Sequence, residues 1–570
     1  MYELPNTEIG VSASSSYGAR AAGYTRIEVE IDALKVAICA WKSRYNSLSI
    51  VSRLPPEILS AIFELNILCP GELNMDLVRA SHVCSHWRSV ALSSPGLWSR
   101  IPLTHQRWSQ EMLARSKCWP LTIEGSLNSL DQTALYHVLG HLSRIRRVSL
   151  CEPLPPRPLF SIRIEDASPS FTLRAPTLES FVLHTASTLR LPDNLFGRDA
   201  PRLRHLDLAN CSFSWNSPIF HKLTTLKLSR AHLDAQKTVE EVIFFLKRTT
   251  RLETLVLSAV LKPSSHDSSL LPEHIAHLPY LSHLQIDADY ISCARLLNHL
   301  THPATTHIKL VCESPMGTHG PLLLPLAMPH LNVAAFVHQG GFLPPTEVCE
   351  TISEKARHVG SLALRRPLRA SVGDSLCSLQ IWPGSGLGWN STTYSPPQLE
   401  FHMVQNGWHL NQYGQKVLED VLCSLQLHDL ESLSTENIPF GKDVWLNSFS
   451  QLKRLRDVRV KGDGGNPFLD ALATGMPEIN GNSEQSFSTG AQLGFRGLRS
   501  LVCDNWDFVG GGNRHGSNID LFVDCLQKRH EHGVILDELL LKDCDGLMQE
   551  DVEAMCSFIP SVHGWDWESL

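Results

Sequence analysis

Two pairs of histidines have a spacing at which their imidazole rings could share a ligand: His137 with His141, and His299 with His302. Imidazole is a common zinc ligand, but a zinc site needs three or four ligands held by a second shell of hydrogen bonds. Neither pair has a cysteine or a cluster of carboxylates nearby at ligand spacing. We therefore expect no metal ion and no cofactor.

Patterns typical of catalysis are equally scarce. The 570 residues contain no GxSxG, no HExxH and no kinase set of HRD and DFG. The glycines at 510–512 do not belong to a phosphate-binding glycine loop between a strand and a helix, so we expect them in a turn. The sequence predicts that the chain is not an enzyme.

Composition argues against nucleic-acid and membrane binding. The net charge is −8, and lysines and arginines are scattered rather than gathered in a basic patch. The longest apolar stretch, Pro321 to Val337, is broken by two prolines, a histidine and an asparagine. The 15 cysteines are isolated and form no CxxC pair, as expected of reduced thiols, and the first residues do not resemble a secretory signal. We expect a cytoplasmic or nuclear protein.

The segment from Leu54 to Ile101 has the pattern of a small helical module. Pro55, Pro56 and Glu57 favour a helix start, because proline fits the first helical turn and a carboxylate is favourable there. Four apolar residues then define one broad apolar face: Ile58, Leu59, Ile62 and Phe63.

A second helix is expected from about Met75 to Leu92, and the tail Ser-Pro-Gly-Leu-Trp ends at Trp98. About 45 residues cannot bury this much apolar surface alone. We therefore expect another chain or domain to cover part of the module.

These pieces resemble, in their order and spacing, the F-box: a Leu-Pro start, an Ile-Leu/Ile-Phe helix, a Val-Cys-x-x-Trp-Arg helix and a Pro-x-Leu-Trp end. The resemblance implies docking on a Skp-family adaptor, which holds a cullin and a RING protein in an SCF-type ubiquitin ligase. The residues that would carry the docking, some of which must instead form the module's core, are Leu54, Pro55, Pro56, Ile58, Leu59, Ile62, Phe63, Val83, Cys84, Trp87, Leu97 and Trp98. The alternative is an ordinary three-helix piece of a larger domain.

Upstream, apolar residues repeat with the spacing of a heptad seam. They step by four and three residues through Ile27, Ile31, Leu34, Ile38, Trp41, Tyr45 and Leu48. A helix is predicted over residues 26–50, and residues 27–48 could either associate with a second copy or pack back on the same chain. Residues 1–25, rich in Ser, Ala and Gly, are expected to be disordered.

After the module, helix and strand patterns alternate over residues 102–160, and then a short LxxLxLxx motif recurs. Its starts lie 25, 20, 29 and 29 residues apart, at Leu178, Leu203, Leu223, Leu252 and Leu281. This period resembles leucine-rich repeats, in which stacked strands bury a shared apolar core. Weaker units begin at His330, Val359, Gln398, Leu430, Leu455, Leu498 and Leu536.

The predicted fold class is therefore α/β: a short all-α F-box-like module at residues 51–101, then a leucine-rich-repeat-like solenoid over residues 161–570. Gly-, Ser- and Pro-rich insertions are expected near 383–397 and 462–492. The alternative for the array is an α/β domain with apolar strands.

The function implied by the resemblance is that of a substrate receptor, in which the module docks on the adaptor and the repeats hold a target protein. Residues 27–150 look like the expanded F-box sets of mushroom-forming fungi. In the repeats, the positions flanking the inward leucines are the candidate target-binding residues: His205, Asp207, Thr225, Lys227, Thr254 and Val256. The alternatives are a repeat scaffold without ubiquitin ligase output, or a module that only caps the solenoid.

Overall fold

The computed structural model describes residues 17–67, 75–152, 169–230, 236–262, 275–313, 361–365, 375–382, 397, 399–404, 422, 425, 427–438, 440–462, 465–474, 494–508 and 518–564. The chain divides into two compact units, one of residues 1–186 with 191–203 and the other of residues 187–190 with 204–570. Among the described residues, no helix is both long and apolar enough to cross a membrane.

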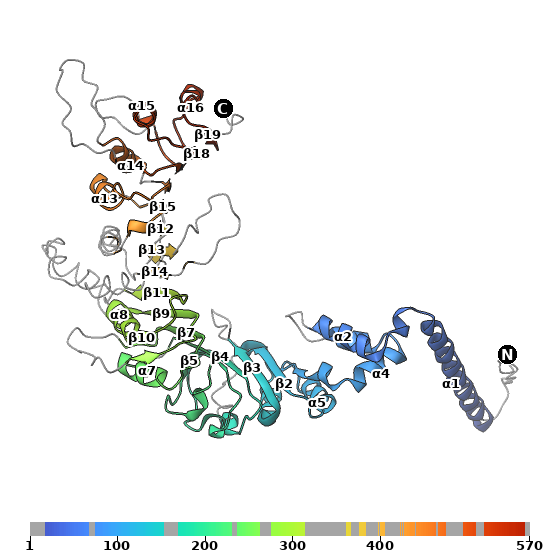
Figure 1. The fold of residues 1–570 in the computed structure, drawn as a ribbon. Helices are drawn as coiled ribbons and strands as arrows, with labels where there is room; N and C mark the ends of the chain where they lie inside the picture. Colours follow the sequence, from blue (N-terminus) through green and yellow to red (C-terminus); the bar gives the residue numbers. More distant parts are fainter. Residues whose placement is uncertain are drawn as a thin grey trace, which may run out of the picture. The chain divides into compact units, whose positions relative to one another are not determined.

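The first unit begins with helices (Figure 1). They are α1 (Tyr17–Ser47), η1 (Val51–Arg53), α2 (Pro56–Ile67), α3 (Met75–Ser81), α4 (Ser85–Ser93) and η2 (Pro95–Trp98). Helix α1 extends through residues 17–25, where disorder was expected, because Ala19, Ala21 and Ala22 are strong helix formers. The rest of the expected disordered segment lies outside the described residues.

The single helix predicted from Met75 to Leu92 is interrupted in the structure. Residues 82–84 leave the helical conformation, and Cys84 is extended with φ of −157°. The Cys84 Sγ then accepts a hydrogen bond of 3.4 Å from the Trp87 N–H, which caps α4. Apolar periodicity does not reveal this break, because it continues across the turn.

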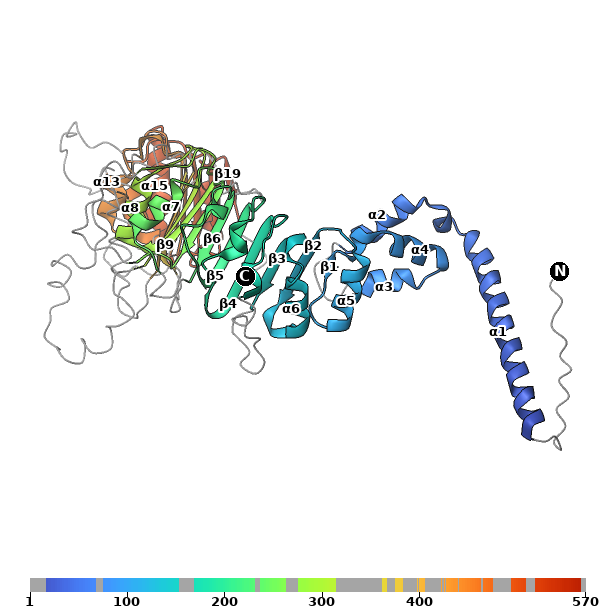
Figure 2. The same ribbon diagram turned by 90° about the horizontal axis from the view of Figure 1, so that it is seen from below.

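The strands that follow these helices form a parallel sheet. They are β1 (Arg100–Ile101), β2 (Leu121–Ser126), β3 (Ile145–Cys151) and β4 (Ser180–Arg190), separated by α5 (Gln106–Arg115), η3 (Leu127–Ser129), α6 (Gln132–Leu139) and η4 (Leu142–Arg144), with η6 (Leu195–Arg198) after β4. Strands β1 to β4 pair in sequence order, and Figure 2 shows α5 and α6 on one side of them. The helix and strand units expected at 102–160 thus already belong to a parallel sheet as far as residue 152, and residues 153–160 lie outside the described residues.

The second unit contains a longer run of strands. Its elements are β5 (His205–Ser212), η7 (Pro218–Phe220), β6 (Thr225–Ser229), α7 (Val239–Leu246), β7 (Thr254–Ser258), β8 (Ala276–His277), β9 (His283–Asp289), α8 (Tyr290–Asn298), β10 (Leu300–Thr301), β11 (His307–Glu313), β12 (Ser361–Arg365), β13 (Ser375–Trp382), β14 (Leu399–Val404), η9 (Leu427–Asp429), β15 (Ser432–Glu436), α13 (Lys442–Ser448), β16 (Asp457–Lys461), α14 (Gly465–Leu472), β17 (Ser500–Asp504), α15 (Asn518–Glu531), β18 (Glu538–Lys542), α16 (Gln549–Cys556) and β19 (Ser561–His563).

The repeat leucines form buried rows across neighbouring strands. From β5 to β11 one row joins Leu206, Leu226, Leu255, Leu284 and Ile308 in parallel register, and each of these side chains is buried. Their flanking residues point to the other face, since side chains alternate along a strand. Figure 1 shows α7 and α8 on the same side of these strands.

A left-handed residue follows many of these strands. Arg230, Ala259, Asn437, Gly462 and Asn505 all have φ between 53° and 73°. Each donates its N–H to a carbonyl of the next strand in the sheet, at 2.8–2.9 Å. At Gly462 a side chain is impossible without movement, because its Cβ would collide with Oδ1 of Asn437.

The middle of the sheet departs from sequence order. Strand β11 pairs with β14, β14 with β13, β13 with β12, and β12 with β15. Strand β13 is antiparallel to both neighbours, so β12, β13 and β14 form a meander inserted between β11 and β15. Two predicted repeat strands, after Val359 and Gln398, belong to this meander, and the unit at His330 lies outside the described residues.

The C-terminal repeats are joined by aromatic packing. The rings of Trp445 and Phe468 lie 4.8 Å apart, and those of Phe468 and Phe495 lie 5.4 Å apart. Phe468 belongs to α14, which forms inside the stretch 462–492 that was expected to be an insertion. Its buried apolar face explains the difference. Residues 475–493 and most of the other expected insertion, 383–396, lie outside the described residues.

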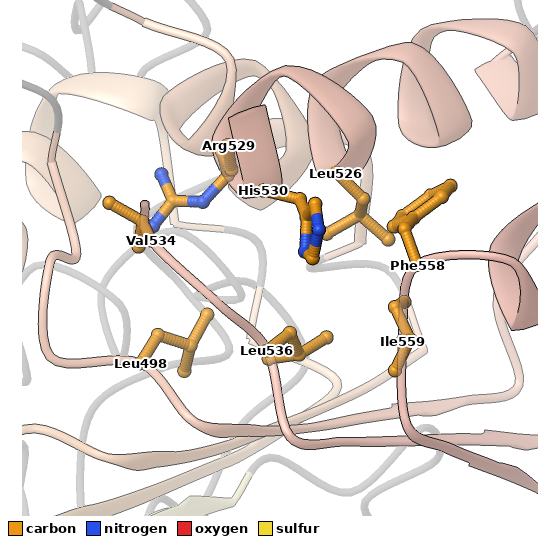
Figure 3. A pocket seen from close by; sticks show the side chains of 8 residues that line it. All are labelled: Leu498, Leu526, Arg529, His530, Val534, Leu536, Phe558 and Ile559. Carbon is orange, nitrogen blue, oxygen red and sulfur yellow. The ribbon is translucent and has the colours of Figure 1, made fainter. Parts of the chain in front are cut away.

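A buried arginine ties α15 to the preceding repeat. The Arg529 side chain is 3% exposed and donates hydrogen bonds to the carbonyls of Leu472, Gly494 and Phe495 at 3.5, 3.0 and 2.8 Å. Figure 3 shows Arg529 and His530 projecting from α15 among apolar side chains. The pocket there has about 10 Å³ of space, enough for one water molecule at most.

The fold class predicted from the sequence is confirmed: a short helical module precedes a mixed α/β region whose long, largely parallel sheet is consistent with a leucine-rich-repeat-like solenoid.

Replacing Arg529 with methionine keeps an apolar stem but removes the arginine donor from the buried carbonyls of Leu472 and Gly494, whereas the Phe495 carbonyl still accepts from the Leu498 N–H. We expect Arg529→Met to lower the free energy of unfolding by about 2 kcal/mol or more, since an unsatisfied buried polar group costs roughly 1–3 kcal/mol. Urea unfolding followed by circular dichroism measures this. The control is Arg251→Met, at an exposed position, and equal midpoints for the two variants would contradict the assigned role of Arg529.

Candidate docking site

The apolar face expected on α2 divides into two parts. Leu59 and Phe63 are buried, whereas Ile58 and Ile62 are 50% and 38% exposed. Consecutive residues lie 100° apart around a helix, so the packing of one side of α2 against α3 and α4 cannot bury both Leu59 with Phe63 and Ile58 with Ile62. The first pair supports the module, and the second pair lies on its surface.

The end of the module is anchored by a buried tryptophan. The Trp98 Nε1–H donates a 2.8 Å hydrogen bond to the carbonyl of Ala91 in α4, and the side chain is fully buried. The Arg115 guanidinium lies 4.4 Å from the centre of the Trp98 ring, while its Nε donates to Glu111 at 2.8 Å. These contacts hold η2 against both α4 and α5.

An edge-to-face aromatic contact links α2 to α4. The rings of Phe63 and Trp87 lie 5.3 Å apart at 60°. The hydroxyl of Ser60 also donates to that of Ser94 at 3.2 Å. Together these contacts fix the side of α2 that faces the module and therefore the side that faces away.

The twelve predicted docking residues fall into three groups by burial. Leu59, Phe63, Leu97 and Trp98 are buried; Leu54, Cys84 and Trp87 are half-buried; Pro55, Pro56, Ile58, Ile62 and Val83 are exposed. The last group offers the most surface to a partner, and the half-buried group offers part of its surface. The docking role of the whole set stays a prediction.

Sequence reasoning missed one member of the exposed surface. Leu65 is 67% exposed and continues the stripe of Ile58 and Ile62 along α2. Leu65 follows Ile58 by seven residues and Ile62 by three, so it lies within about 60° of both around the helix axis. The same periodicity could have identified it. We call Ile58, Ile62, Leu65 and the exposed Val83 of the α3–α4 turn the exposed apolar set.

The six predicted target-binding residues are brought together in two rows. One row joins His205, Thr225 and Thr254 on adjacent strands, and the other joins Asp207, Lys227 and Val256; all six are half-buried. The rows continue into β9 and β11 through His283 and His307, and through Gln285 and Lys309. His283 and Gln285 of β9 could have been predicted from the sequence, because they occupy the same positions in the repeat that begins at Leu281.

This sheet face has mixed chemistry. The rings of His283 and His307 lie 4.8 Å apart. Burial raises the pKa of the Asp287 carboxyl, and the hydrogen bond that it accepts from the Ser258 hydroxyl at 2.6 Å opposes this shift. Cations, carboxylates, hydroxyls and apolar groups all occur here, so no single kind of side chain dominates the face.

The histidines considered for metal binding form two separate pairs. The rings of His137 and His141 lie 5.7 Å apart, while His299 and His302 each donate from Nδ1 to a backbone carbonyl. Within the described parts of the chain, no group of three or more His, Cys, Asp or Glu side chains could hold a metal ion.

Adjacent residues of α2 provide a matched test of its two sides. Leu59→Ala should lower the free energy of unfolding of the helical module by about 2–5 kcal/mol, because it leaves a cavity in the core. Ile58→Ala should cost less than about 1 kcal/mol, because half of that side chain is already in water. Thermal unfolding of both variants measures the difference, and equal losses would show that Ile58 also belongs to the core.

Comparison with known proteins bears on this module. No curated protein matches the chain. Residues 51–104 match the family model described as F-box-like, over a range that begins at η1 and ends after β1. The chain therefore carries an F-box-like domain at residues 51–104, followed by a long and largely parallel sheet.

Proposed function

We propose that this chain is the substrate-receptor subunit of an SCF-type ubiquitin ligase. The F-box-like domain would dock on a Skp-family adaptor and, through it, on the cullin and RING subunits. The observation that carries the proposal is the exposed apolar set, since exposed apolar patches mark surfaces that bind partners. The role would place the chain in the cytoplasm or the nucleus.

The energetics of such docking rest on a few anchors. Fully burying an aliphatic side chain contributes about 1.5–3 kcal/mol. Ile58 and Leu65 expose half or more of their surface, as does Val83 in the neighbouring turn. A surface with several such side chains can therefore supply the anchors around which protein interfaces are built.

The chain would perform no chemical step in this role. It would raise the effective concentration of a bound target near the ubiquitin carrier held by the other subunits, and orientation would add to the effect. The rows of the sheet from His205 to His307 and from Asp207 to Lys309, which are half-buried apart from the exposed His283, are the proposed target-binding face. Their mixed side chains suit a protein surface better than a small apolar ligand.

A pull-down of the purified chain on a Skp-family adaptor tests the docking. The variant Ile58→Asp with Val83→Asp should lose binding by at least about tenfold, because burying an unpaired carboxylate in an interface costs several kcal/mol. The matched control, Phe244→Asp with Tyr280→Asp, changes two exposed residues of the second unit and should bind normally.

Failure of the intact chain to bind would exclude the receptor role. The module would then only cap the repeat array. If the chain binds the adaptor but a captured partner gains no ubiquitin in a reconstituted reaction, the remaining alternative is a scaffold without ubiquitin ligase output.

We also propose that α1 mediates self-association. Its heptad-spaced side chains, from Ile27 to Tyr45, are 37–78% exposed. No described residue covers these side chains. The last residue of the predicted seam, Leu48, lies just beyond the end of the helix at Ser47. The spacing by four and three residues is that of a two-stranded coiled coil, and the exposure of these side chains supports a second copy rather than packing on the same chain.

Two substitutions on the seam should abolish self-association. We expect Ile31→Asp with Ile38→Asp to convert a dimer to a monomer in sedimentation velocity, because the carboxylates would face each other across the seam. Val29→Asp with Val36→Asp is the control, since both valines are exposed on the opposite side of the same helix. A monomeric intact chain at micromolar concentration would exclude the proposal.

A further inference from the structure

Two basic turns of the second unit lie side by side. Lys453 and Arg456 come from the turn before β16, and Arg496 and Arg499 come from the turn before β17. With Gly497 and Asp537 they line an open pocket of about 500 Å³. This is far larger than the apolar pocket beside Arg529 (Figure 3).

A glycine allows the two turns to approach. A Cβ at Gly497 would lie 2.7 Å from the carbonyl oxygen of Lys453 and 2.8 Å from that of Leu455. Both distances are shorter than a carbon and an oxygen tolerate without a shift of the backbone. Gly497 thus lets the basic side chains of one turn stand next to those of the other.

The pocket concentrates positive charge on a chain whose net charge is −8. Its lining carries four cations and one carboxylate. Within the described parts of the chain, no side-chain hydrogen bond or ion pair is made by Lys453, Arg456 or Arg496, although Arg456 lies close enough to Asp457 to act against the rise that burial causes in the pKa of that carboxyl. Like charges held together repel one another, so a bound anion would relieve a real electrostatic cost.

Other arginines of the second unit differ from those of the pocket, because their guanidinium groups are bound to partners within the chain. Arg454, in the same turn, pairs with Asp429 at 2.7 Å. Arg529 is buried and bound to three carbonyls. Arg499 is partly oriented, because its Nη1 donates to the carbonyl of Ile535 at 3.0 Å, and its other donors stay available to a ligand.

We propose that this pocket binds the phosphate group of a multiply charged ligand. Guanidinium groups match phosphate oxygens with paired N–H donors, and several converging cations strengthen the attraction. The pocket volume exceeds that of a single phosphate, so the group would belong to a larger molecule, either a phosphorylated peptide segment or a small phosphate ester. The inference concerns the second unit and does not depend on docking of the F-box-like domain.

Calorimetric titration of the full chain with pyrophosphate, and fluorescence anisotropy with a labelled, otherwise uncharged phosphoserine peptide, test the proposal. The unphosphorylated peptide is the ligand control. Arg456→Gln with Arg499→Gln should weaken binding by at least tenfold. The matched variant Arg248→Gln with Arg251→Gln removes the same charge outside the pocket and should leave affinity unchanged.

The outcomes separate the two sources of phosphate. Binding of the phosphopeptide, with displacement by pyrophosphate, would assign the pocket to a protein segment, whereas binding of pyrophosphate alone would assign it to a small phosphate ester. No binding of either probe, or equal loss in the pocket and control variants, would overturn the proposal. If the double variant unfolds, Lys453→Gln replaces it, because that side chain is exposed and should weaken binding measurably.

Discussion

At five strand ends of the second unit, a left-handed residue donates its N–H to a carbonyl of the next strand in the sheet. The bond is worth about 1 kcal/mol net, and the left-handed conformation costs a non-glycine residue roughly 1–2 kcal/mol. The free energy gained from the bond and the cost of the conformation nearly cancel. The bond therefore fixes the register of neighbouring strands and adds little to the free energy of unfolding. Register in turn decides which side chains form the buried leucine rows and which form the open face, including the proposed target-binding rows.

The same ladder positions the basic pocket. Strands β16 and β17 pair from Asp457 with Ser500 to Lys461 with Asp504, so the turns that precede them must also be neighbours. A slip of one residue would exchange the two faces of a strand, and the four cations would no longer converge. The pocket is therefore a property of the stack and cannot be read from either turn alone.

Much of the repeat region could be predicted because local spacing determines it. Leu206 and Leu208 recur in the neighbouring repeats at intervals of 20 to 29 residues, and this recurrence is sufficient to locate the buried strands. The meander could not be predicted in this way, since β12 and β14 have the same local pattern as repeat strands, and only pairing over a long distance distinguishes them. On α2, Ile58 and Leu59 are equally apolar. Leu59 lies in the core because it packs against other helices, and the spacing of apolar residues in the sequence does not predict those contacts.

The reversed order of the meander has a consequence for folding kinetics. Ile308 pairs with Leu284 across 24 residues on one side and with Leu399 across 91 residues on the other. Closing the longer loop costs about 1 kcal/mol more in chain entropy. Repeat arrays normally grow by adding each unit to its neighbour, but growth from β11 must wait until a strand from far along the chain has arrived. Pairing at high sequence separation slows folding, so the strands before and after the meander can form as two separate nuclei, and the time that they take to join sets the folding rate of the unit.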